Sequence, residues 1–295
     1  MPSISPTPEK PAAGLYVVAT PIGHLADITL RAIAILSGVD LIAAEDTRHT
    51  RRLLDHYQIR NRLVSYHEHN EAQRTVELIA QLEQGAAIAL VTDAGTPSVS
   101  DPGFRLVQAA VAKGIPVFPI PGVSAAIAAL SAAGLPTDQF TFVGFPDRGR
   151  NKRRRQLEAL ARLPYTLIFY QSPQRLISFL QELIEILGDR PAVSARELTK
   201  LHEEFLRGSL SQILAGLQDR ESVKGECTLL VAGAETSPAP VGPEALDAAI
   251  VQGLAQKTVS LKELSKALAA RFQMSRKRIY ERALQLKEDA GNANE

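Results

Sequence analysis

Short aliphatic runs alternate with amphipathic stretches along the first half of the chain. Between Leu15 and Ala133 the runs LYVVAT, VDLIAA, RLVSY, AAIALV and IPVFPI each precede a helical pattern. Strands that alternate with helices are joined by crossover connections, so they pair in parallel within one sheet. The pattern therefore predicts an α/β domain over residues 14–135 that is built on a parallel sheet.

The helix expected after the third run shows the local signals on which this interpretation depends. Asn70 can cap its first turn, Val76, Ile79 and Leu82 are spaced to share one buried face, and Gly85 is placed to end it.

A second series of strand-like runs follows Pro136. The runs QFTFVGF, YTLIFY, PAVSAREL and ECTLLVAG are interrupted by helical segments such as Pro173 to Leu187. They predict a second α/β domain over 136–235, with a parallel or mixed sheet. With 295 residues and 45% hydrophobic side chains, the chain can bury two or three such cores. The proline-rich residues 236–244 are expected to be a linker, and residues 1–13 a disordered tail.

The region 245–290 carries helical signals of a different kind. Ser260 and Glu263 can form a capping box that Val259 and Leu264 staple, and Ser275 can cap a second helix, with Met274 against Ile279. The apolar residues recur at helical spacing, first Leu261, Leu264, Leu268 and Phe272, then Ile279, Ala283 and Leu286. With the apolar pattern from Leu246 to Leu254, they predict a small helix-turn-helix domain.

Composition excludes several classes of protein. A single cysteine, Cys227, allows no intramolecular disulfide, and the Cys and His residues lack the spacing of a zinc site, so no metal is expected. No apolar run approaches the roughly 20 residues that span a bilayer, and the N-terminal residues lack the apolar core of a signal peptide. We expect a cytoplasmic protein that does not insert into membranes.

Two basic clusters stand out although the formal net charge is only +1. Six Lys or Arg side chains and no acid lie between 148 and 155: Arg148, Arg150, Lys152, Arg153, Arg154 and Arg155. A second cluster, in the C-terminal helices, includes Arg276, Lys277 and Arg278. Either cluster alone could be a solvated helix face. Together they favour a phosphate-rich partner such as RNA.

The segment LVTDAGTPSVSDPG, from Leu90 to Gly103, leaves a predicted strand at its carboxyl end, where parallel sheets bind ligands. Gly95 permits close approach of a ligand to the backbone, while Asp93 and Thr96 supply polar groups. Two carboxylates without a Lys or Arg favour a neutral or cationic ligand over a phosphate. Asp101, which precedes Pro102, is expected to be the N-cap of the next helix.

Six segments carry a resemblance to a known family. VATPIGHLADIT, DLIAAEDTRHTRRLL, LVTDAGTPSVSDPG, PGVSAAIAALSAAGLPTDQFTFVGF, LIFYQSP and ARELTK, in this order, resemble the ribosomal RNA small subunit methyltransferase I family of the tetrapyrrole-methylase superfamily. The resemblance covers nearly all of residues 14 to 288. It implies methyl transfer from S-adenosylmethionine to the ribose 2′-hydroxyl of a decoding-centre cytidine in 16S ribosomal RNA, by a cytoplasmic homodimer.

The same resemblance implies a two-domain tetrapyrrole-methylase fold with the cofactor between the α/β domains. The positions that correspond to cofactor contacts are Asp93, Gly95, Thr96, Val99, Ser124, Ala125, Tyr170, Ala195, Gly225 and Glu226. Three positions depart from the family pattern, where His24 replaces Asn, Gln171 replaces Glu and Gln174 replaces His. Gln171 keeps the hydrogen-bonding reach of Glu but not its charge.

A ribose hydroxyl is a weak acid, so a group that accepts or orients its proton would assist the transfer. The candidates, all at the end of one predicted strand, are Glu45, Asp46, Arg48 and His49. Asp46 is also the expected N-cap of the next helix, and Glu45 with Arg48 could form a structural ion pair. His67 and His69 could equally be surface residues.

Three other functions remain compatible with parts of the sequence. A tetrapyrrole methyltransferase would use the same two α/β domains, but the basic clusters would have no role. A non-enzymatic RNA-binding protein would use the basic clusters, but the segment from Leu90 to Gly103 would have none. A carboxylate-metal hydrolase built on Glu45 and Asp46 has the least support.

Overall fold

A computed structural model describes residues 10–235, 243–255, 260–272 and 274–292. The chain divides into two compact units, Met1–Ala234 and Glu235–Glu295. Residues 1–9 of the expected tail, 236–242 of the expected linker, and Val259 of the expected staple lie outside the described residues.

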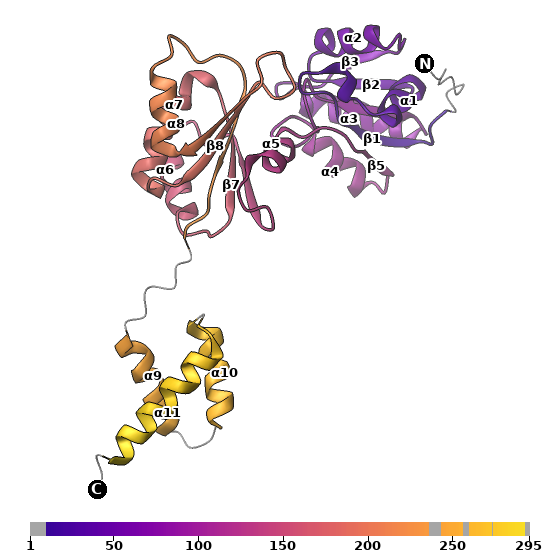
Figure 1. Cartoon of the computed structure of the whole chain (residues 1–295). Helices are drawn as coiled ribbons and strands as arrows, with labels where there is room; N and C mark the ends of the chain where they lie inside the picture. The colour runs from indigo at the N-terminus through magenta and orange to yellow at the C-terminus, as the bar shows by residue number, and fades with distance from the viewer. Residues whose placement is uncertain (1–9, 236–242, 256–259, 273, 293–295) are drawn as a thin grey trace, which may run out of the picture. The chain divides into compact units, whose positions relative to one another are not determined.

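The first sheet of the N-terminal unit is entirely parallel, as predicted (Figure 1). Its strand order is β3-β2-β4-β1-β5. The strands are β1 (Gly14–Val18), β2 (Leu41–Ala44), β3 (Leu63–Ser65), β4 (Ala87–Val91) and β5 (Val117–Ile120). The helices are η1 (Leu25–Asp27), α1 (Leu30–Gly38), α2 (Thr47–His56), α3 (Glu71–Glu83) and α4 (Phe104–Ala112).

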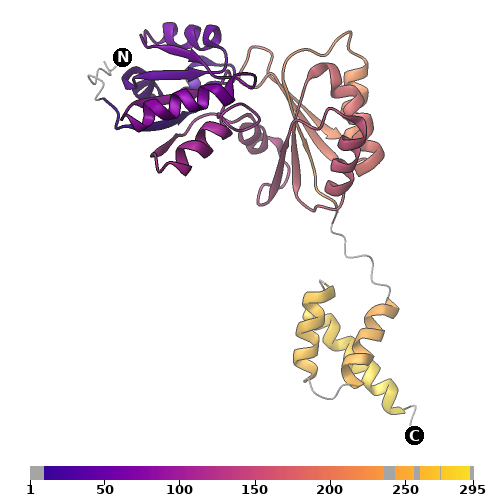
Figure 2. The ribbon, with the colours of Figure 1, turned by 180° about the vertical axis from the view of Figure 1, so that it is seen from behind.

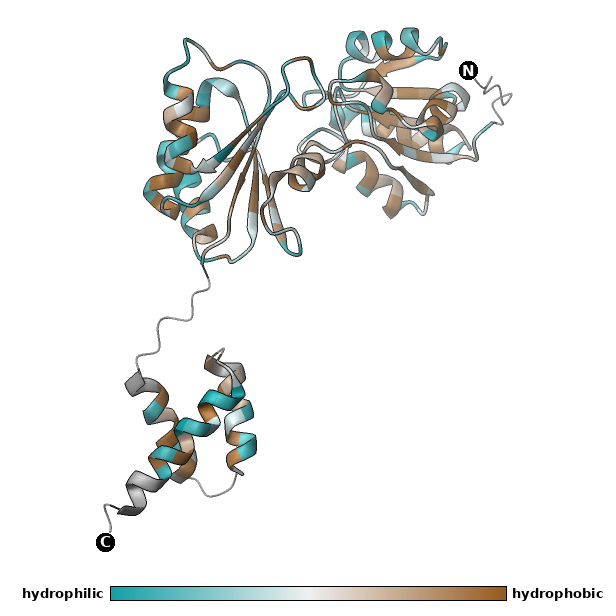
Figure 3. Cartoon of the chain, viewed as in Figure 1, coloured by the Kyte–Doolittle hydropathy of each residue, from teal (hydrophilic) through white to brown (hydrophobic). Residues whose placement is uncertain are grey.

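Successive residues of the central strand β4 face two separate cores. Ala87, Ala89 and Val91 pack with residues of α1 and α2, whereas Ile88 and Leu90 pack with residues of α3 and α4. Side chains of a strand alternate between the two faces of its sheet, so a strand covered by helices on both faces is apolar throughout. This explains the uninterrupted apolar runs of the sequence, which lie along the strands in Figure 3.

Two details of α3 differ from the prediction. Asn70 occupies the N-cap position but makes no capping hydrogen bond, because its Oδ1 accepts from the backbone N–H of His67 at 2.9 Å. Val76 is 71% exposed. The buried residues of the helix are Thr75, Leu78, Ile79 and Leu82, so its buried face is rotated away from Val76.

The second sheet of the N-terminal unit is mixed, with strand order β6-β7-β10-β8-β9. Its strands are β6 (Phe140–Gly144), β7 (Thr166–Gln171), β8 (Pro191–Arg196), β9 (Glu204–Ser209) and β10 (Cys227–Val231). Only β6 and β7 pair in parallel; the other neighbours are antiparallel. The edge strand β9 was not among the predicted strands.

Helices cover both faces of this second sheet. On one face lie α6 (Arg150–Leu160), α7 (Pro173–Leu187) and α8 (Leu210–Gln218), as Figures 1 and 2 show. On the other lies α5 (Ala125–Ala133), whose Ala126, Ala129 and Leu130 share a core with Ile168 and Leu230. Thus α5, which the sequence groups with the first domain, packs against the second sheet, between the two sheets of the unit.

The C-terminal unit is a bundle of α9 (Pro243–Ala255), α10 (Leu261–Phe272) and α11 (Arg276–Asn292). Its core contains the predicted apolar stripes of α10 and α11 together with Leu246 and Ile250 of α9. The capping box is confirmed, since Glu263 N–H donates to Ser260 Oγ at 3.3 Å and Ser260 N–H to Glu263 Oε2 at 3.2 Å. Arg278 N–H donates to Ser275 Oγ at 3.3 Å, which confirms the second cap.

The membrane prediction concerns helix length and polarity. Within the described residues, no helix is both long and apolar enough to cross a bilayer.

Candidate functional site

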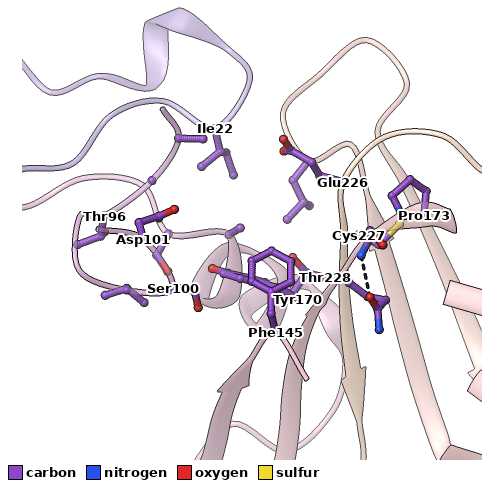
Figure 4. Close-up of a pocket in the computed structure, with 18 residues that line it drawn as sticks. Ile22, Thr96, Ser100, Asp101, Phe145, Tyr170, Pro173, Glu226, Cys227 and Thr228 are labelled. Atoms are coloured by element: carbon purple, nitrogen blue, oxygen red, sulfur yellow. Dashed lines mark hydrogen bonds between the residues drawn. The ribbon is translucent and has the colours of Figure 1, made fainter. Parts of the chain in front are cut away.

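A cavity of about 320 Å³ lies in the N-terminal unit, between the loop that follows β4 and the ends of β7 and β10 (Figure 4). Both sheets contribute to its wall, as does the start of α5. The lining residues are Ile22, Ala94, Gly95, Thr96, Val99, Ser100, Asp101, Ser124, Ala125, Phe145, Tyr170, Gln171, Ser172, Pro173, Leu198, Glu226, Cys227 and Thr228.

Backbone hydrogen bonds fix the first half of the β4 loop. Thr20 N–H donates to Gly95 O at 2.8 Å, and Gly95 N–H donates to Thr20 O at 3.0 Å. Gly95 has φ +87°, a left-handed conformation that strains other residues. Both backbone groups of Gly95 are thus bonded to Thr20, and the glycine also allows the turn. Gly95 lines the cavity, so the close approach of a ligand to its backbone stays a prediction. The Thr96 hydroxyl donates to Val123 O at 3.2 Å and joins this loop to the segment before α5.

The second half of the loop directs Asp101 into the cavity (Figure 4). Ser98 and Ser100 have φ of +69° and +66°, and Gly103 has φ +140°. A Cβ atom on Gly103 would lie 2.6 Å from Ser98 Oγ and 2.8 Å from Leu90 Cδ2, so only glycine fits there. Helix α4 consequently begins at Phe104 with Gly103 at its N-cap. The prediction that Asp101 is this N-cap is wrong.

Asp101 lies among other carboxylates. Burial, and then the nearby charges of Glu45, Asp93 and Glu226, disfavour its ionised form and raise the pKa of Asp101 to about 7, although the neighbouring Thr92 side chain acts in the opposite direction. Burial followed by Glu45 also raises the pKa of Asp93. The Thr92 hydroxyl donates to Glu45 Oε2 at 2.5 Å.

Tyr170 dominates the opposite wall. Its hydroxyl oxygen accepts from Ala126 N–H at 3.3 Å, at the beginning of α5. The rings of Phe142 and Phe145 pack edge-on against it, with centroids 5.1 and 5.6 Å away. Burial raises the pKa of Tyr170, so the phenol is neutral near pH 7. This wall offers flat, rigid apolar surfaces to a ligand.

The cavity combines such apolar surfaces with two carboxylates, Asp101 and Glu226. S-adenosylmethionine carries an aromatic base, a sulfonium cation and an ammonium group, so it matches both the apolar and the acidic parts of this lining. Within the described residues, no cluster of His, Cys, Asp and Glu could hold a metal ion.

Most of the expected cofactor contacts line the cavity, namely Gly95, Thr96, Val99, Ser124, Ala125, Tyr170 and Glu226. Three do not. Asp93 accepts from Asp46 N–H at 3.1 Å, Ala195 is fully buried in the core beneath α5, and Gly225, with φ +89°, packs against Glu197. Among the lining residues that sequence reasoning missed, Thr228 could have been found from strand pairing, because it lies opposite Tyr170.

Two of the three positions that depart from the family pattern, His24 and Gln171, have local roles in the structure. His24 caps η1, with its Nδ1 accepting from Ala26 N–H at 3.2 Å, a task that asparagine also performs well. Gln171 is 8% exposed, and its Oε1 accepts from Ser172 N–H at 2.9 Å. Nothing in the structure explains Gln174.

Of the candidate catalytic residues, Asp46 has the predicted surroundings and Glu45 does not. Asp46 caps α2, as predicted, by accepting from Arg48 N–H at 2.8 Å. It also pairs with the Arg48 guanidinium at 2.7 Å, which holds the pKa of Asp46 well below its usual range. The expected pair of Glu45 with Arg48 is therefore wrong. Glu45 instead accepts from the Thr92 hydroxyl and from Asp93 N–H at 3.3 Å.

The first basic cluster lies on and just before α6, and α7 supplies acids that neutralise part of it. Arg153 Nε donates to Glu182 Oε2 at 2.6 Å. Arg154 pairs with Glu158 and Glu185 at 3.0 and 2.7 Å. Within the described part of the chain, the exposed members of this cluster that form no ion pair are Arg148, Arg150, Lys152 and Arg155.

In the C-terminal unit Arg276, Lys277 and Arg278 are all exposed at the start of α11. Arg276 Nη2 donates to Lys262 O at 3.2 Å, and Lys277 lies 4.0 Å from Glu281.

Residues 14–214 match the family model of the tetrapyrrole (corrin/porphyrin) methylases. The chain is 45% identical to a ribosomal RNA small subunit methyltransferase I of Synechocystis, over 93% of this chain and 99% of that protein. It is 44% identical to the protein of that name from Escherichia coli O157:H7, over 92% of this chain and 94% of that protein.

Among solved structures, the methyltransferase CobJ aligns with a TM-score of 0.56 and 22% identity, over 75% of this chain and 95% of that one. A uroporphyrin-III C-methyltransferase from Thermus thermophilus, complexed with S-adenyl homocysteine, aligns with a TM-score of 0.52 and 20% identity. The alignment covers 74% of this chain and 96% of that one. These likenesses establish the fold.

Proposed function

This chain belongs to the ribosomal RNA small subunit methyltransferase I family, within the tetrapyrrole methylases, and from that premise we propose that it methylates a ribose 2′-hydroxyl of 16S ribosomal RNA, using S-adenosylmethionine. The ribose belongs to a cytidine of the decoding centre. The observation that carries the proposal is the cavity lined from both sheets, which has apolar walls and two carboxylates and suits a cationic methyl donor.

S-adenosylmethionine, when bound, supplies an already activated methyl group. The protein's task is then to hold the donor and the attacking oxygen in line and to exclude water, which can contribute about 7–11 kcal/mol. Tyr170 and Phe145 supply apolar surface for the donor, and Asp101 and Glu226 complement its positive charge. The other members of the proposed cofactor site are Gly95, Thr96, Val99, Ser124 and Ala125.

The basic surfaces support an RNA partner in the form of the small ribosomal subunit. Exposed cations on α6 and at the start of α11 can neutralise phosphates and release their counterions. We place the protein in the cytoplasm, where ribosomes are assembled. A homodimer belongs to the same proposal, because Leu30 and Leu201 expose 64% and 92% of their surface and a second copy would cover such side chains.

The test is methyl transfer from labelled S-adenosylmethionine to small ribosomal subunits that lack the modification, followed by mapping of the labelled nucleotide. We expect one labelled ribose in 16S ribosomal RNA. Transfer to a uroporphyrin-type macrocycle and not to the subunit would favour the tetrapyrrole alternative, because a uroporphyrin-III C-methyltransferase shares the fold. If calorimetry detects no binding of S-adenosylmethionine, the alternative of a non-enzymatic RNA-binding protein is favoured.

A further inference from the structure

The wall of the first cavity contains one aromatic side chain that is far more exposed than its neighbours. Phe145 directly follows β6 and is 59% exposed, although Gly144 and Pro146 on either side of it are buried (Figure 4). Tyr170, in the same wall, is half-buried. Of the large apolar residues that line the cavity, Phe145 is the most exposed. Because 18 residues share this lining, a donor bound in the cavity covers only part of the Phe145 ring.

The Phe145 ring is held in place by contacts on one side. Gly144 has φ +70°, and a Cβ atom there would lie 2.7 Å from Ser100 Oγ, so the end of β6 lies directly against the β4 loop. The ring of Tyr170 packs edge-on against Phe145, with the two centroids 5.6 Å apart. These contacts fix one side of the Phe145 ring, and its exposure shows that the other side is open.

Two arginines lie at the same edge of the second sheet as Phe145. Strands β6 and β7 pair in parallel, so the segments that follow them leave the sheet at one edge. Arg148 lies three residues beyond Phe145, a span of at most about 11 Å along the backbone. Arg175 lies in the first turn of α7, two residues after Pro173, which lines the cavity. Both arginines are exposed, and neither forms an ion pair with the part of the chain that the structure describes.

The loop between β6 and α6 is fixed by its own hydrogen bonds. Asp147 is the only acid between residues 145 and 155, and its Oδ1 accepts from Gly149 N–H at 3.2 Å. Arg153 Nη1 donates to the carbonyl oxygens of Asp147 and Arg148 at 3.2 and 3.3 Å. These bonds hold the backbone of the loop, so the exposed aromatic ring and Arg148 keep a constant separation.

An exposed aromatic ring beside free guanidinium groups suits single-stranded nucleic acid, because a base stacks on the ring and the cations neutralise the phosphates. We propose that Phe145 is the stacking platform for the base of the nucleotide that is methylated, and that Arg148 and Arg175 bind the phosphates beside it. This inference rests on the proposed function. A base stacked on Phe145 brings its own ribose to the edge of the cavity in which we place the methyl donor.

Other exposed aromatic residues of the N-terminal unit lack this combination. Phe140 is 40% exposed, but it lies at the opposite end of β6 and does not line the cavity. Phe104 is 67% exposed, but it lines a second cavity whose one guanidinium, that of Arg105, is paired with Glu71 at 3.3 Å. Among the described Phe and Tyr residues of this unit that are exposed, only Phe145 lines the first cavity.

The first experiment uses fluorescence. The chain contains no tryptophan, so Phe145→Trp introduces a single reporter at the proposed platform. The full-length variant is saturated with S-adenosylhomocysteine, which occupies the donor cavity, and is then titrated with single-stranded oligocytidylate. A base that stacks on the indole ring should quench its fluorescence further. The matched control is Phe140→Trp, which carries its tryptophan at the other end of β6, and the RNA should leave its fluorescence unchanged.

The second experiment measures methyl transfer to undermethylated small subunits. Phe145→Ala should raise KM for the subunit by about 5- to 150-fold, the loss expected for one stacked base, and Phe145→Tyr, which keeps a flat ring, should restore it. Phe145→Leu separates stacking from donor binding, because leucine keeps apolar bulk but has no flat face. It should raise KM for the subunit while its affinity for S-adenosylmethionine, measured by calorimetry, changes far less.

The third experiment concerns the phosphates. Replacing Arg148 and Arg175 together by Gln should weaken binding of single-stranded RNA and make its dependence on salt shallower, by about 0.7 in logarithmic slope per lost contact. Arg162→Gln is the matched control, because Arg162 is also exposed but lies beyond the far end of α6. It should leave the slope unchanged.

The outcomes separate this inference from the function on which it rests. If the wild-type protein does not methylate the subunit, the proposed function fails, and the inference with it. If it does, but Phe145→Ala and Phe145→Leu keep the wild-type KM for the subunit, Phe145 is not the platform. RNA that binds Phe145→Trp without further quenching would overturn the inference in the same way. An unchanged salt slope would remove the two arginines from the site. Should Phe145→Ala fail to fold, the comparison of Phe145→Leu with Phe145→Tyr decides.

Discussion

At the scale of single residues, the raised pKa of Asp101 makes the stability of the fold depend on pH. A carboxyl group held in an acidic, partly buried position binds its proton more tightly in the folded protein, with a pKa near 7, than in the unfolded chain, near 3.8. The folded state therefore loses stability as pH rises through this interval, and the loss is complete above pH 7. We predict that Asp101→Asn raises the thermal midpoint by a few degrees at pH 8, with a gain that shrinks toward pH 4 in calorimetry.

Glu226→Gln is the control for this measurement. The Glu226 side chain is 75% exposed, so its neutralisation should change the thermal midpoint little at any pH. A lower midpoint for Asp101→Asn at pH 8 would instead mean that the ionised carboxylate stabilises the fold.

The same residue shows where the sequence is informative about the site and where it is not. The position of the β4 loop at a strand end was predictable, because parallel sheets place such loops at one edge. The direction in which the Asp101 side chain points was not predictable. Asp-Pro-Gly is a common helix entry, and the left-handed Ser98 and Ser100, which displace the N-cap to Gly103, have no signature in residue type.

At the scale of elements, the basic residues of α6 form two groups, one paired with acidic side chains and one exposed. Arg153 and Arg154 hold α6 against α7 through Glu182 and Glu185, so their charges are largely used within the protein. We predict that replacing Arg150, Lys152 and Arg155 together by Gln weakens RNA binding. The slope of the logarithm of the binding constant against the logarithm of the salt concentration should become shallower by about 0.9 per lost phosphate contact for a duplex, and by about 0.7 for a single strand.

The matched variant for this experiment is Arg153→Gln with Arg154→Gln. It should lower the thermal midpoint, because Glu182, whose side chain is 15% exposed, loses its partner. It should change the salt dependence less than the triple variant. If the double variant reduced the salt dependence of RNA binding more than the triple variant did, Arg153 and Arg154 would be the residues that contact RNA.

Elements were predictable where burial is two-sided. The strands of the first sheet were predictable from their continuous apolar runs, and the caps of α10 and α11 were predictable from Ser260 and Ser275. Strand β9 was not predictable, because it lies at the edge of its sheet, pairs only with β8 and carries no fully buried residue. The packing of α5 on the second sheet depends on tertiary contacts that no local pattern encodes.

At the scale of the whole molecule, the first cavity and the helices α9, α10 and α11 belong to different compact units. The core of α9, α10 and α11 contains residues of the C-terminal unit alone, and the other cores contain residues of the N-terminal unit alone. The first cavity is lined entirely by N-terminal residues. Donor binding should therefore not require the C-terminal helices.

We predict that a chain ending at Glu235 folds and binds S-adenosylmethionine with the affinity of the full protein, but methylates small subunits far more slowly. Binding energy from a remote surface holds the ribose hydroxyl in line, and the truncation removes that surface while leaving the donor in place. Replacing Arg276, Lys277 and Arg278 by Gln in the full chain should slow transfer in the same direction, because these exposed cations are part of what the truncation deletes. Calorimetry and a single-turnover assay measure the two quantities. Wild-type transfer by the truncated chain would leave the C-terminal unit without a role in docking, whereas failure to fold would show that the units depend on each other.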